Sequence, residues 1–523
     1  MISKLHGAAR AVVAAVVLLV GGGAAAQVPE DVLVVAQIAE PKSMDPHAVT
    51  AVNDFRILVN LYDGLVRFGD GTLEVEPALA ESWEVADDGT VYTFQLREGV
   101  TFHDGTPFDA EAVRFNFERM LDEDHPYHDT GPFPLAFFFQ AVEEVEAVDE
   151  LTVRFHLSEP YAPFLSNLAY PTGLIVSPEA VRAHGEDFGR NPAGTGPFVF
   201  RTWEANRQVA VERNADYWDG APPLEGVVFR PITDANARVA EMLAGNIDLM
   251  VEVPPDNVEM FDSDAAFRYQ EQPGPHLWFL ILNTREAPFD DVRMRRAVNY
   301  AIDKETLVED VLQGTATVAT GPTPAAFAWA YNAELEPYPH DPDRARALVE
   351  EAGYGDGVEV VFFVTEGGSG MLDPVAMGTA IQADLAEVGI DAEIRTFEWN
   401  TFLDRVNAGL EGRADMAEMA WMTNDPDTLP YLALRSAAMP EDGGFNSGYY
   451  SNPEVDRLLE AARRATDRAE RARLYKEMQR IVYDDAPWAF VATWQQNAVT
   501  KANVENFELQ PSFLLRLHEV AKR

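Results

Sequence analysis

The segment Leu79–Val113 narrows the possible folds of this chain more than any other part of its sequence. From Tyr92 to Leu96 every second residue is apolar, which is typical of a strand with one buried face. Asp88-Gly89 precedes this strand and Asp104-Gly105 follows it, and both dipeptides indicate turns because glycine accepts a positive φ. The segment therefore predicts two strands joined by a tight turn, then a polar loop that leads into a helix.

Short strands and helices alternate along the rest of the chain, which predicts an α/β fold. Two helix starts are indicated by capping residues, namely Asn452 before Pro453, and Asp467 with Glu470 three residues later. Pro487 is expected to end the second of these helices. We also expect a helix at 291–302 and strands at 32–36, 151–157, 227–232, 358–364 and 392–397.

The first 26 residues have the pattern of a secretory signal peptide, with basic Lys4 and Arg10, an apolar stretch Ala11–Val20 and a small-residue cleavage site at Ala24–Ala26. The apolar stretch is short for a membrane span, so we expect cleavage after Ala26 rather than a retained anchor. The remaining 497 residues (523 less 26) are enough for two or three domains. The chain has no cysteine, which excludes a lipid-anchoring cysteine, disulfides and thiolate metal sites. We therefore expect a periplasmic protein that is not a lipoprotein.

The chain is strongly acidic, with 86 Asp and Glu against 40 Lys and Arg and a formal net charge of −46. This balance argues against nucleic acid as a partner, since phosphate binding needs clustered cations. The charge indicates a solubilising acidic surface. Attraction of cationic ligands is the alternative, but salt screens such a field within about 10 Å, so the charge does not identify a substrate.

A series of short motifs follows the segment at 79–113: Gly194–Phe198, Arg213–Trp218, Gly245–Leu249, Leu282–Thr284, Pro288–Arg293, Ala301–Lys304, Asp341–Ala345 and Glu351–Tyr354. Each motif is weak alone, but their order and spacing across the mature chain resemble those of the family 5 solute-binding proteins. These proteins are the extracytoplasmic receptors of ABC importers for peptides, nickel and glutathione.

The resemblance implies an α/β, two-lobed periplasmic-binding-protein clamp with an additional inserted domain, of type II and the peptide-receptor subclass. Lobe I would comprise 27–60, 186–272 and 495–523, the inserted domain 61–185, and lobe III 273–494. The crossings near Pro273–Pro275 and Trp488–Trp494 would act as hinges.

The implied function is that of a monomeric binding protein rather than an enzyme. Such a binding protein needs no cofactor. It would capture a short peptide or peptide-like solute, glutathione-like solutes included, and deliver it to the permease and ATPase of an ABC importer at the inner membrane. The alternatives are a receptor for a metal chelate or another non-peptide solute such as an oligosaccharide, and a secreted hydrolase that has kept the clamp fold.

Catalytic and metal motifs are weak in this sequence. Neither G-x-S-x-G nor H-E-x-x-H occurs, and the turn position of His103-Asp104 favours a structural role over acid–base chemistry. Two histidines and four acids gather in Asp122–Asp129, a set that suits divalent metals. Pro126 indicates a surface loop there, away from the expected cleft, so we predict no metal site.

Ligand contacts are expected around Trp421–Asp427, which matches the family's ligand-facing loop. In dipeptide receptors the acid that pairs with the peptide amine stands three residues after this tryptophan, where this chain has Asn424. Asp425 could take over that role, while Asp427 serves either the ligand or the turn itself.

The carboxylate-binding arginine of dipeptide receptors also lacks a match, because this chain has Glu366–Gly370 in that region. Backbone N–H groups at Gly368 and Ser369 could receive an anion instead, or the loop is a flexible turn. Trp278 and Trp399 could line the cleft beside Trp421, with core packing as the alternative for each. Motifs of the C-terminal third most resemble the glutathione-receptor branch.

Overall fold

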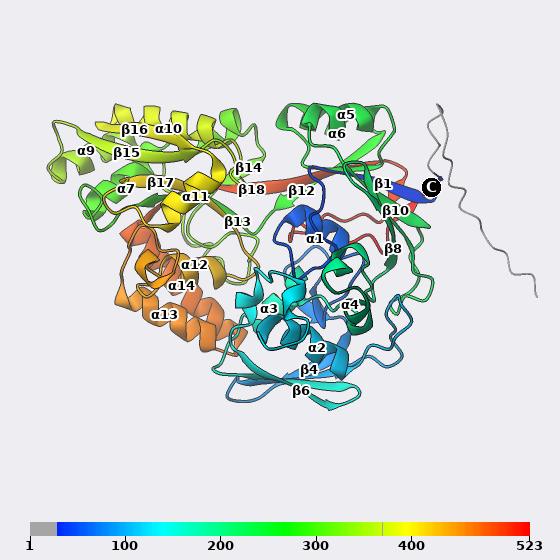
Figure 1. Ribbon diagram of the computed structural model, residues 1–523. Coiled ribbons are helices and arrows are strands. Elements are labelled where there is room, and N and C mark those ends of the chain that lie inside the picture. Colours follow the sequence, from blue (N-terminus) through cyan, green and yellow to red (C-terminus); the bar gives the residue numbers. More distant parts are fainter. Residues whose placement is uncertain (1–28, 369) are drawn as a thin grey trace, which may run out of the picture.

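The computed structural model describes residues 29–368 and 370–523. The expected signal peptide, 1–26, and Ser369 lie outside this part of the chain. Three bodies are visible in Figure 1: lobe III at the upper left, lobe I at the upper right, and the inserted domain below. The α/β prediction is confirmed, because helices pack on a large mixed sheet that runs through both lobes.

The large sheet has twelve strands, of which ten form one continuous order. These are β16 (Ile390–Phe397), β15 (Val358–Thr365), β17 (Met416–Met422), β13 (His276–Leu282), β18 (Trp488–Lys501), β11 (Leu249–Val251), β1 (Val32–Gln37), β10 (Gly226–Pro231), β9 (Gln208–Arg213) and β8 (Phe198–Glu204). The other two, β12 (Phe267–Pro273) and β14 (Ala316–Val318), both pair with β18.

Strand β18 belongs to both lobes. Its first part pairs with β13 of lobe III, and residues 495–501 pair with β12 of lobe I. The chain also crosses between the lobes where β12 ends at Pro273 and β13 begins at His276. In Figure 1, β18 is the long red arrow that connects the two upper bodies. Two neighbouring strands therefore join the lobes.

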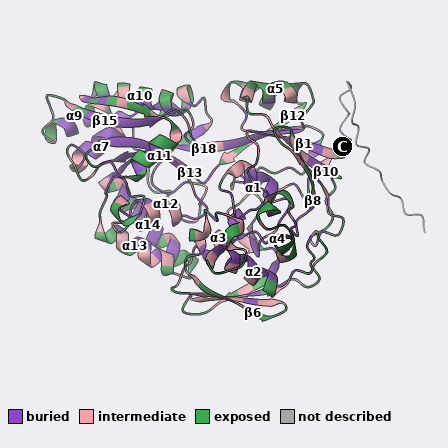
Figure 2. Ribbon diagram, in the orientation of Figure 1, coloured by how far each residue is buried: buried purple, intermediate pink, exposed green. Residues whose placement is uncertain are grey.

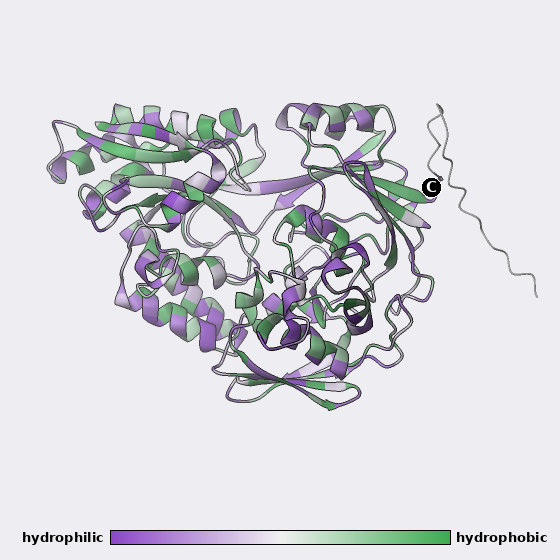
Figure 3. Cartoon of the chain, viewed as in Figure 1, coloured by the Kyte–Doolittle hydropathy of each residue, from purple (hydrophilic) through white to green (hydrophobic). Residues whose placement is uncertain are grey.

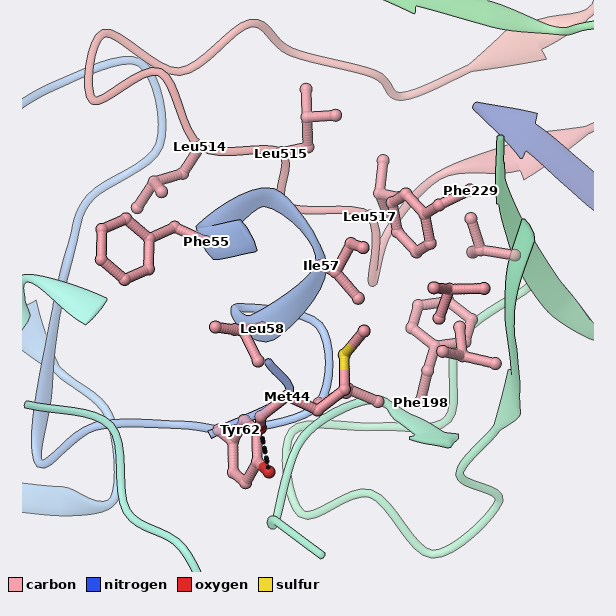
Figure 4. Packing of buried hydrophobic residues seen from close by; sticks show 14 of the residues in the cluster. Met44, Phe55, Ile57, Leu58, Tyr62, Phe198, Phe229, Leu514, Leu515 and Leu517 are labelled. Carbon is pink, nitrogen blue, oxygen red and sulfur yellow. Dashed lines mark hydrogen bonds between the residues drawn. The ribbon is translucent and has the colours of Figure 1, made fainter. Parts of the chain in front are cut away.

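The core of lobe I is built from segments far apart in the sequence. Phe55, Ile57 and Leu58 of α1 (Val52–Leu58) are fully buried, and Figure 4 shows them beside the C-terminal leucines 514, 515 and 517. The Tyr62 hydroxyl donates a hydrogen bond to the Met44 carbonyl, at 2.7 Å. The remaining lobe I helices are α5 (Ala235–Leu243) and α6 (Val258–Ser263), and β19 (Val504–Glu505) pairs with β20 (Ala521–Lys522).

The inserted domain contains the segment that opened the sequence analysis. A four-stranded antiparallel sheet has the order β4 (Ala80–Val85), β5 (Val91–Leu96), β7 (Thr152–Leu157) and β6 (Val142–Asp149). Tyr92, Phe94 and Leu96 are buried, which confirms the alternation, and Asp109 caps the helix that follows. Further elements are β2 (Val66–Phe68), β3 (Val75–Pro77), α2 (Ala110–Leu121) and α3 (Phe164–Ala169), while Ala180 and Val181 of α4 (Pro178–His184) pack in the core of lobe I.

Lobe III packs helices on both faces of its part of the sheet, and its strands are buried and hydrophobic in Figures 2 and 3. The Asn452 and Asp467 side chains cap α13 and α14, as the sequence predicts, and α14 ends just before Pro487. The helices are α7 (Val292–Ala301), α8 (Lys304–Thr306), α9 (Pro342–Glu351), α10 (Pro374–Glu387), α11 (Trp399–Asn407), α12 (Thr428–Ala433), α13 (Pro453–Arg464) and α14 (Arg468–Asp485).

Candidate functional site

A cavity of about 600 Å³ lies between lobe I and lobe III. Lobe I lines it with α1, the start of α5 and residues 252–255, and lobe III lines it with residues 311–313, Thr315, Gly368, Gly370, Leu372 and Asp373. Trp494 and Asn497 of β18 form part of the wall, together with Phe513. Small-molecule sites commonly have about this volume and a similar mix of apolar and polar groups.

A second cavity, of about 200 Å³, adjoins the first, and both are lined by Val52, Met422 and Phe513. It lies between the inserted domain and lobe III, with Thr50, Val52, Ser512 and Phe513 of lobe I completing its wall, and seven of its lining residues are aromatic. Phe137 and Phe445 are among the exposed large apolar residues of the protein. Exposed apolar side chains that gather in a hollow indicate a binding surface, whereas single scattered ones need no explanation. The aromatic residues of this wall are Phe68, Phe137, Phe138, Tyr170, Trp421, Phe445 and Phe513.

Backbone strain gathers around the larger cavity. Nine described residues other than glycine have a positive φ, and four of them line this cavity: Glu252 (57°), Gln313 (48°), Leu372 (59°) and Phe513 (63°). Such conformations cost on the order of 1–3 kcal/mol each and cluster at binding and catalytic sites. The distribution of strain therefore points to the same place as the cavity.

The glycine-rich loop expected to contact ligand reaches the larger cavity through Gly368 and Gly370. A side chain at Gly368 would collide with the ring of Trp399. Gly370 has φ +75°, in the left-handed region that glycine tolerates. Trp399 thus supports the loop from behind and stacks on Phe402, and Ser369 lies outside the described residues.

His276 connects this loop to the crossing strands. Its Nδ1 accepts a hydrogen bond from the Trp494 backbone N–H at 3.1 Å, so its Nε2 carries the proton and donates to the Gly370 carbonyl at 2.8 Å. The imidazole is fully buried, and this burial lowers its pKa to about 4. A neutral histidine therefore holds the cavity loop against β18 at the point where the lobes meet.

Acidification is expected to destabilise the protein through His276. The unfolded state binds a proton near pH 6.5 and the folded state only near pH 4, so stability present above pH 6.5 is lost as the pH falls towards 4. The full effect is about 3 kcal/mol, at about 1.36 kcal/mol per pKa unit. Urea unfolding of the wild type and His276→Gln at several pH values measures it, because the difference cancels other groups such as His47. Parallel curves between pH 7 and pH 4 would contradict this role.

Two buried arginines lie on the lobe I wall of the larger cavity. Arg56 forms an ion pair with Glu252, at 3.0 Å, and its Nε donates to the Phe513 carbonyl. Arg238 is also buried, but it donates only to backbone carbonyls. The wall therefore carries one neutralised guanidinium and one that is held by neutral groups.

In the expected ligand-facing loop, Trp421–Asp427, some residues line the smaller cavity and others point into the protein interior. Trp421 and Asn424 line the smaller cavity, and Trp421 makes an edge contact with Phe445. The Asn424 amide donates to Asn167 Oδ1 of the inserted domain at 2.7 Å, and its Oδ1 accepts from the Thr428 hydroxyl. Asn424 thus reaches the cavity wall while it joins lobe III to the inserted domain.

Asp425 and Asp427 point into the protein. Asp425 forms an ion pair with Arg471 at 3.0 Å and accepts a hydrogen bond from the Ser166 hydroxyl of the inserted domain. Asp427 lies 3.4 Å from Arg463, and burial raises the pKa of its carboxyl to about 6. Neither lines the two cavities, because their carboxylates pair with the buried Arg471 and the partly buried Arg463.

Trp278 lies in the core of lobe III and not on the cavity wall. It is fully buried, and its indole N–H donates to the Met371 carbonyl at 3.1 Å. Its influence on the cavity is indirect, since Met371 stands between Gly370 and Leu372, which both line it. Of the two roles considered for Trp278, lining the cleft or packing in the core, its position in the structure agrees with core packing.

The other candidates from the sequence have structural partners. Both ring nitrogens of His103 are bonded to backbone groups, those of Gly194 and Gly196. His128 is bonded to the Arg119 carbonyl. Within residues 29–368 and 370–523, no group of three or more His, Asp or Glu side chains is arranged to hold a metal ion, and no helix is long and apolar enough to cross a bilayer.

Several cavity residues were missed by sequence reasoning. Arg56 is distant in the chain from Arg238 and Glu252, and Asp373 was overlooked beside the glycine-rich loop. One signal could have found Arg238: it stands among the apolar positions of its helix, next to Val239 and four residues before Met242. A charged residue on the buried side of a helix requires an explanation.

Two lobes joined by crossing strands, with a cavity between them, define a two-lobed ligand-binding clamp. The model of the bacterial extracellular solute-binding proteins, family 5, matches residues 74–439. The chain belongs to this family.

The relatives extend over nearly the whole chain. Di/tripeptide-binding protein 2 of Pseudomonas aeruginosa is 34% identical over 496 residues, which cover 92% of each protein. Heme-binding protein A of Haemophilus influenzae is 37% identical over 451 residues, 83% of this chain and 81% of that protein. The ABC transporter-associated periplasmic binding protein DppA from Helicobacter pylori, solved with the peptide STSA, has a TM-score of 0.78 and 32% identity, covering 94% of this chain and 98% of that one.

Proposed function

We propose that the chain is the periplasmic receptor of an ABC importer and binds a short peptide or peptide-like solute between lobes I and III. The observation that carries this proposal is the cavity of about 600 Å³ lined by both lobes, with the apolar cavity beside it. The relatives support it, since one is a di/tripeptide-binding protein and another was solved with a peptide. The protein acts by binding alone and delivers its ligand to a membrane permease and ATPase.

The working protein is a monomer that begins after Ala26. We assign lobe I to 27–60, 186–272 and 495–523, the inserted domain to 61–185, and lobe III to 273–494. The topology supports the boundaries at 272/273 and 494/495, because the sheet passes from one lobe to the other at Pro273–His276 and within β18. A ligand that contacts both lobes stabilises the closed arrangement over the open one.

Thermal unfolding with candidate ligands tests this function. Met-Leu, Ser-Thr-Ser-Ala and glutathione represent peptides, haem and nickel–histidine represent metal chelates, and maltotriose represents oligosaccharides. A peptide at about 100 times its Kd stabilises the native state by about 2.7 kcal/mol and raises the Tm. We expect a rise with at least one peptide. A rise only with a chelate or the sugar would replace the peptide assignment by that class.

A further inference from the structure

Arg238 is a buried cation that forms no ion pair with a carboxylate of residues 29–368 or 370–523. It is 5% exposed, and its guanidinium donates to the carbonyls of Ile232 (2.9 Å), Thr233 (3.1 Å) and Glu252 (3.4 Å). Its buried Nε has no hydrogen-bond partner in the part of the chain that the structure describes. Among the described residues, no carboxylate oxygen lies within 4.0 Å of this guanidinium, whereas Arg56 beside it is paired with Glu252. The positive charge on this part of the wall is therefore incompletely neutralised.

Burial makes this arrangement costly. Desolvation lowers the pKa of the Arg238 guanidinium from its usual value, although Glu252 and Asp234 act in the opposite direction. A buried charge is stabilised by a counter-ion with hydrogen-bonding oxygens, and arginine suits carboxylates in particular. Because Arg238 lines the larger cavity, an anionic group of a ligand can supply that counter-ion.

The opposite wall carries the complementary charge. Four charged residues line the larger cavity: Arg56, Glu252, Arg238 and Asp373. The first two neutralise each other, which leaves Arg238 on lobe I and Asp373 on lobe III. Asp373 caps α10 through one long bond from the Ala376 N–H, at 3.4 Å, and forms no ion pair with a described residue. The cavity is thus positive towards lobe I and negative towards lobe III.

We propose that the larger cavity binds a free peptide as a zwitterion, with its carboxylate on Arg238 of lobe I and its ammonium group directed to Asp373 of lobe III. The inference rests on the proposed peptide-binding function and names the residues that bind the two ends of the peptide. It explains how the chain recognises both ends although Asn424 carries no charge and Asp425 is engaged by Arg471. A ligand held in this way bridges the lobes and favours closure.

Calorimetric titration of the wild-type mature protein with Met-Leu, its C-terminal amide and its N-acetyl form tests the proposal. A hydrogen bond to a charged group contributes enough to change affinity by about 10- to 100-fold. We expect the amide and the N-acetyl form each to bind about 10- to 100-fold more weakly than Met-Leu. Equal affinities for the acid and the amide would overturn the carboxylate assignment, and equal affinities for the free and acetylated amine would overturn the role of Asp373.

Variants then assign the residues. Arg238→Gln should bind Met-Leu and its amide within about threefold of each other, and Asp373→Asn should do the same for the free and acetylated amine. Arg238→Lys keeps the charge, so a partial preference for the acid should remain even if the glutamine variant folds poorly. Arg295→Gln is the matched control, because Arg295 is also buried and donates only to carbonyls, but it lies outside both cavities.

The possible outcomes distinguish a failure of the Arg238 and Asp373 assignment from a failure of the proposed peptide-binding function. Retention of the acid preference in Arg238→Gln, or its loss in Arg295→Gln as well, would overturn the assignment to Arg238 while peptide binding stands. Absence of binding by all three forms of Met-Leu, and by the other peptides of the thermal panel, would overturn both proposals together.

Discussion

Replacement of Asp425 by alanine is expected to lower the free energy of unfolding by about 3–5 kcal/mol, the usual cost of breaking a buried ion pair from one side. Asp425 is 2% exposed, and the Arg471 side chain with which it pairs is 10% exposed. Alanine leaves that guanidinium buried without its carboxylate and also releases Ser166 of the inserted domain. Urea unfolding of the ligand-free protein measures the loss.

Ser166→Ala provides the comparison, because it removes one hydrogen bond to Asp425 and keeps the ion pair. Its expected cost is about 1–2 kcal/mol. A normal unfolding midpoint for Asp425→Ala, together with loss of peptide binding, would show instead that Asp425 contacts the ligand. That outcome would favour the position suggested by the family's ligand-facing loop over the contacts seen in the structure.

Trp278→Ala is expected to cost about 3–5 kcal/mol, as for other large-to-small changes of fully buried aromatic residues. Trp278 has no exposed surface, and it packs in the core on one face of the lobe III sheet. The change also removes the donor to the Met371 carbonyl, next to the cavity loop. We therefore expect weaker peptide binding as well as a lower Tm.

Trp278→Phe separates these two effects. Phenylalanine retains much of the packing but lacks the indole N–H, so its cost of about 1–3 kcal/mol reports mainly the unpaired Met371 carbonyl. Loss of affinity in both variants would place the effect in the hydrogen bond to the loop. A Trp278→Ala protein with the wild-type midpoint and reduced affinity would contradict the buried position of this side chain.

Local signals in the sequence were sufficient for most of the fold. The alternation at Tyr92–Leu96 and the caps at Asn452 and Asp467 depend on neighbouring residues only, and each is found as expected. The pairing of β1 with β10 and β11, and the return of β18 to join both lobes, depend on contacts between distant segments. The resemblance to the family implied the two crossings between the lobes but not the pairing of β1 with β10 and β11, because no local pattern encodes which strands pair.

The site was less predictable because its chemistry depends on pairing. A carboxylate that contacts ligand and one that neutralises a buried arginine look alike in a sequence, and Asp425 is paired with Arg471 across forty-six positions. The reverse holds for Arg238, whose importance lies in the absence of a carboxylate partner among the described residues. The position of Gly368 was easier to predict than the roles of Asp425 and Arg238, because a loop between a strand and a helix limits where its residues can lie.

The shared strand β18 limits the kind of motion that can bring the lobes together. The ladder between β12 and β18 extends over seven residues of each strand, ends at Gln495 and lies within lobe I. The pairing of β14 of lobe III with β18 begins at the next residue, Trp494. A relative motion of the lobes that keeps both ladders intact must therefore bend or twist the backbone at this junction and at Pro273–His276, so closure concentrates the change in φ and ψ in these few residues.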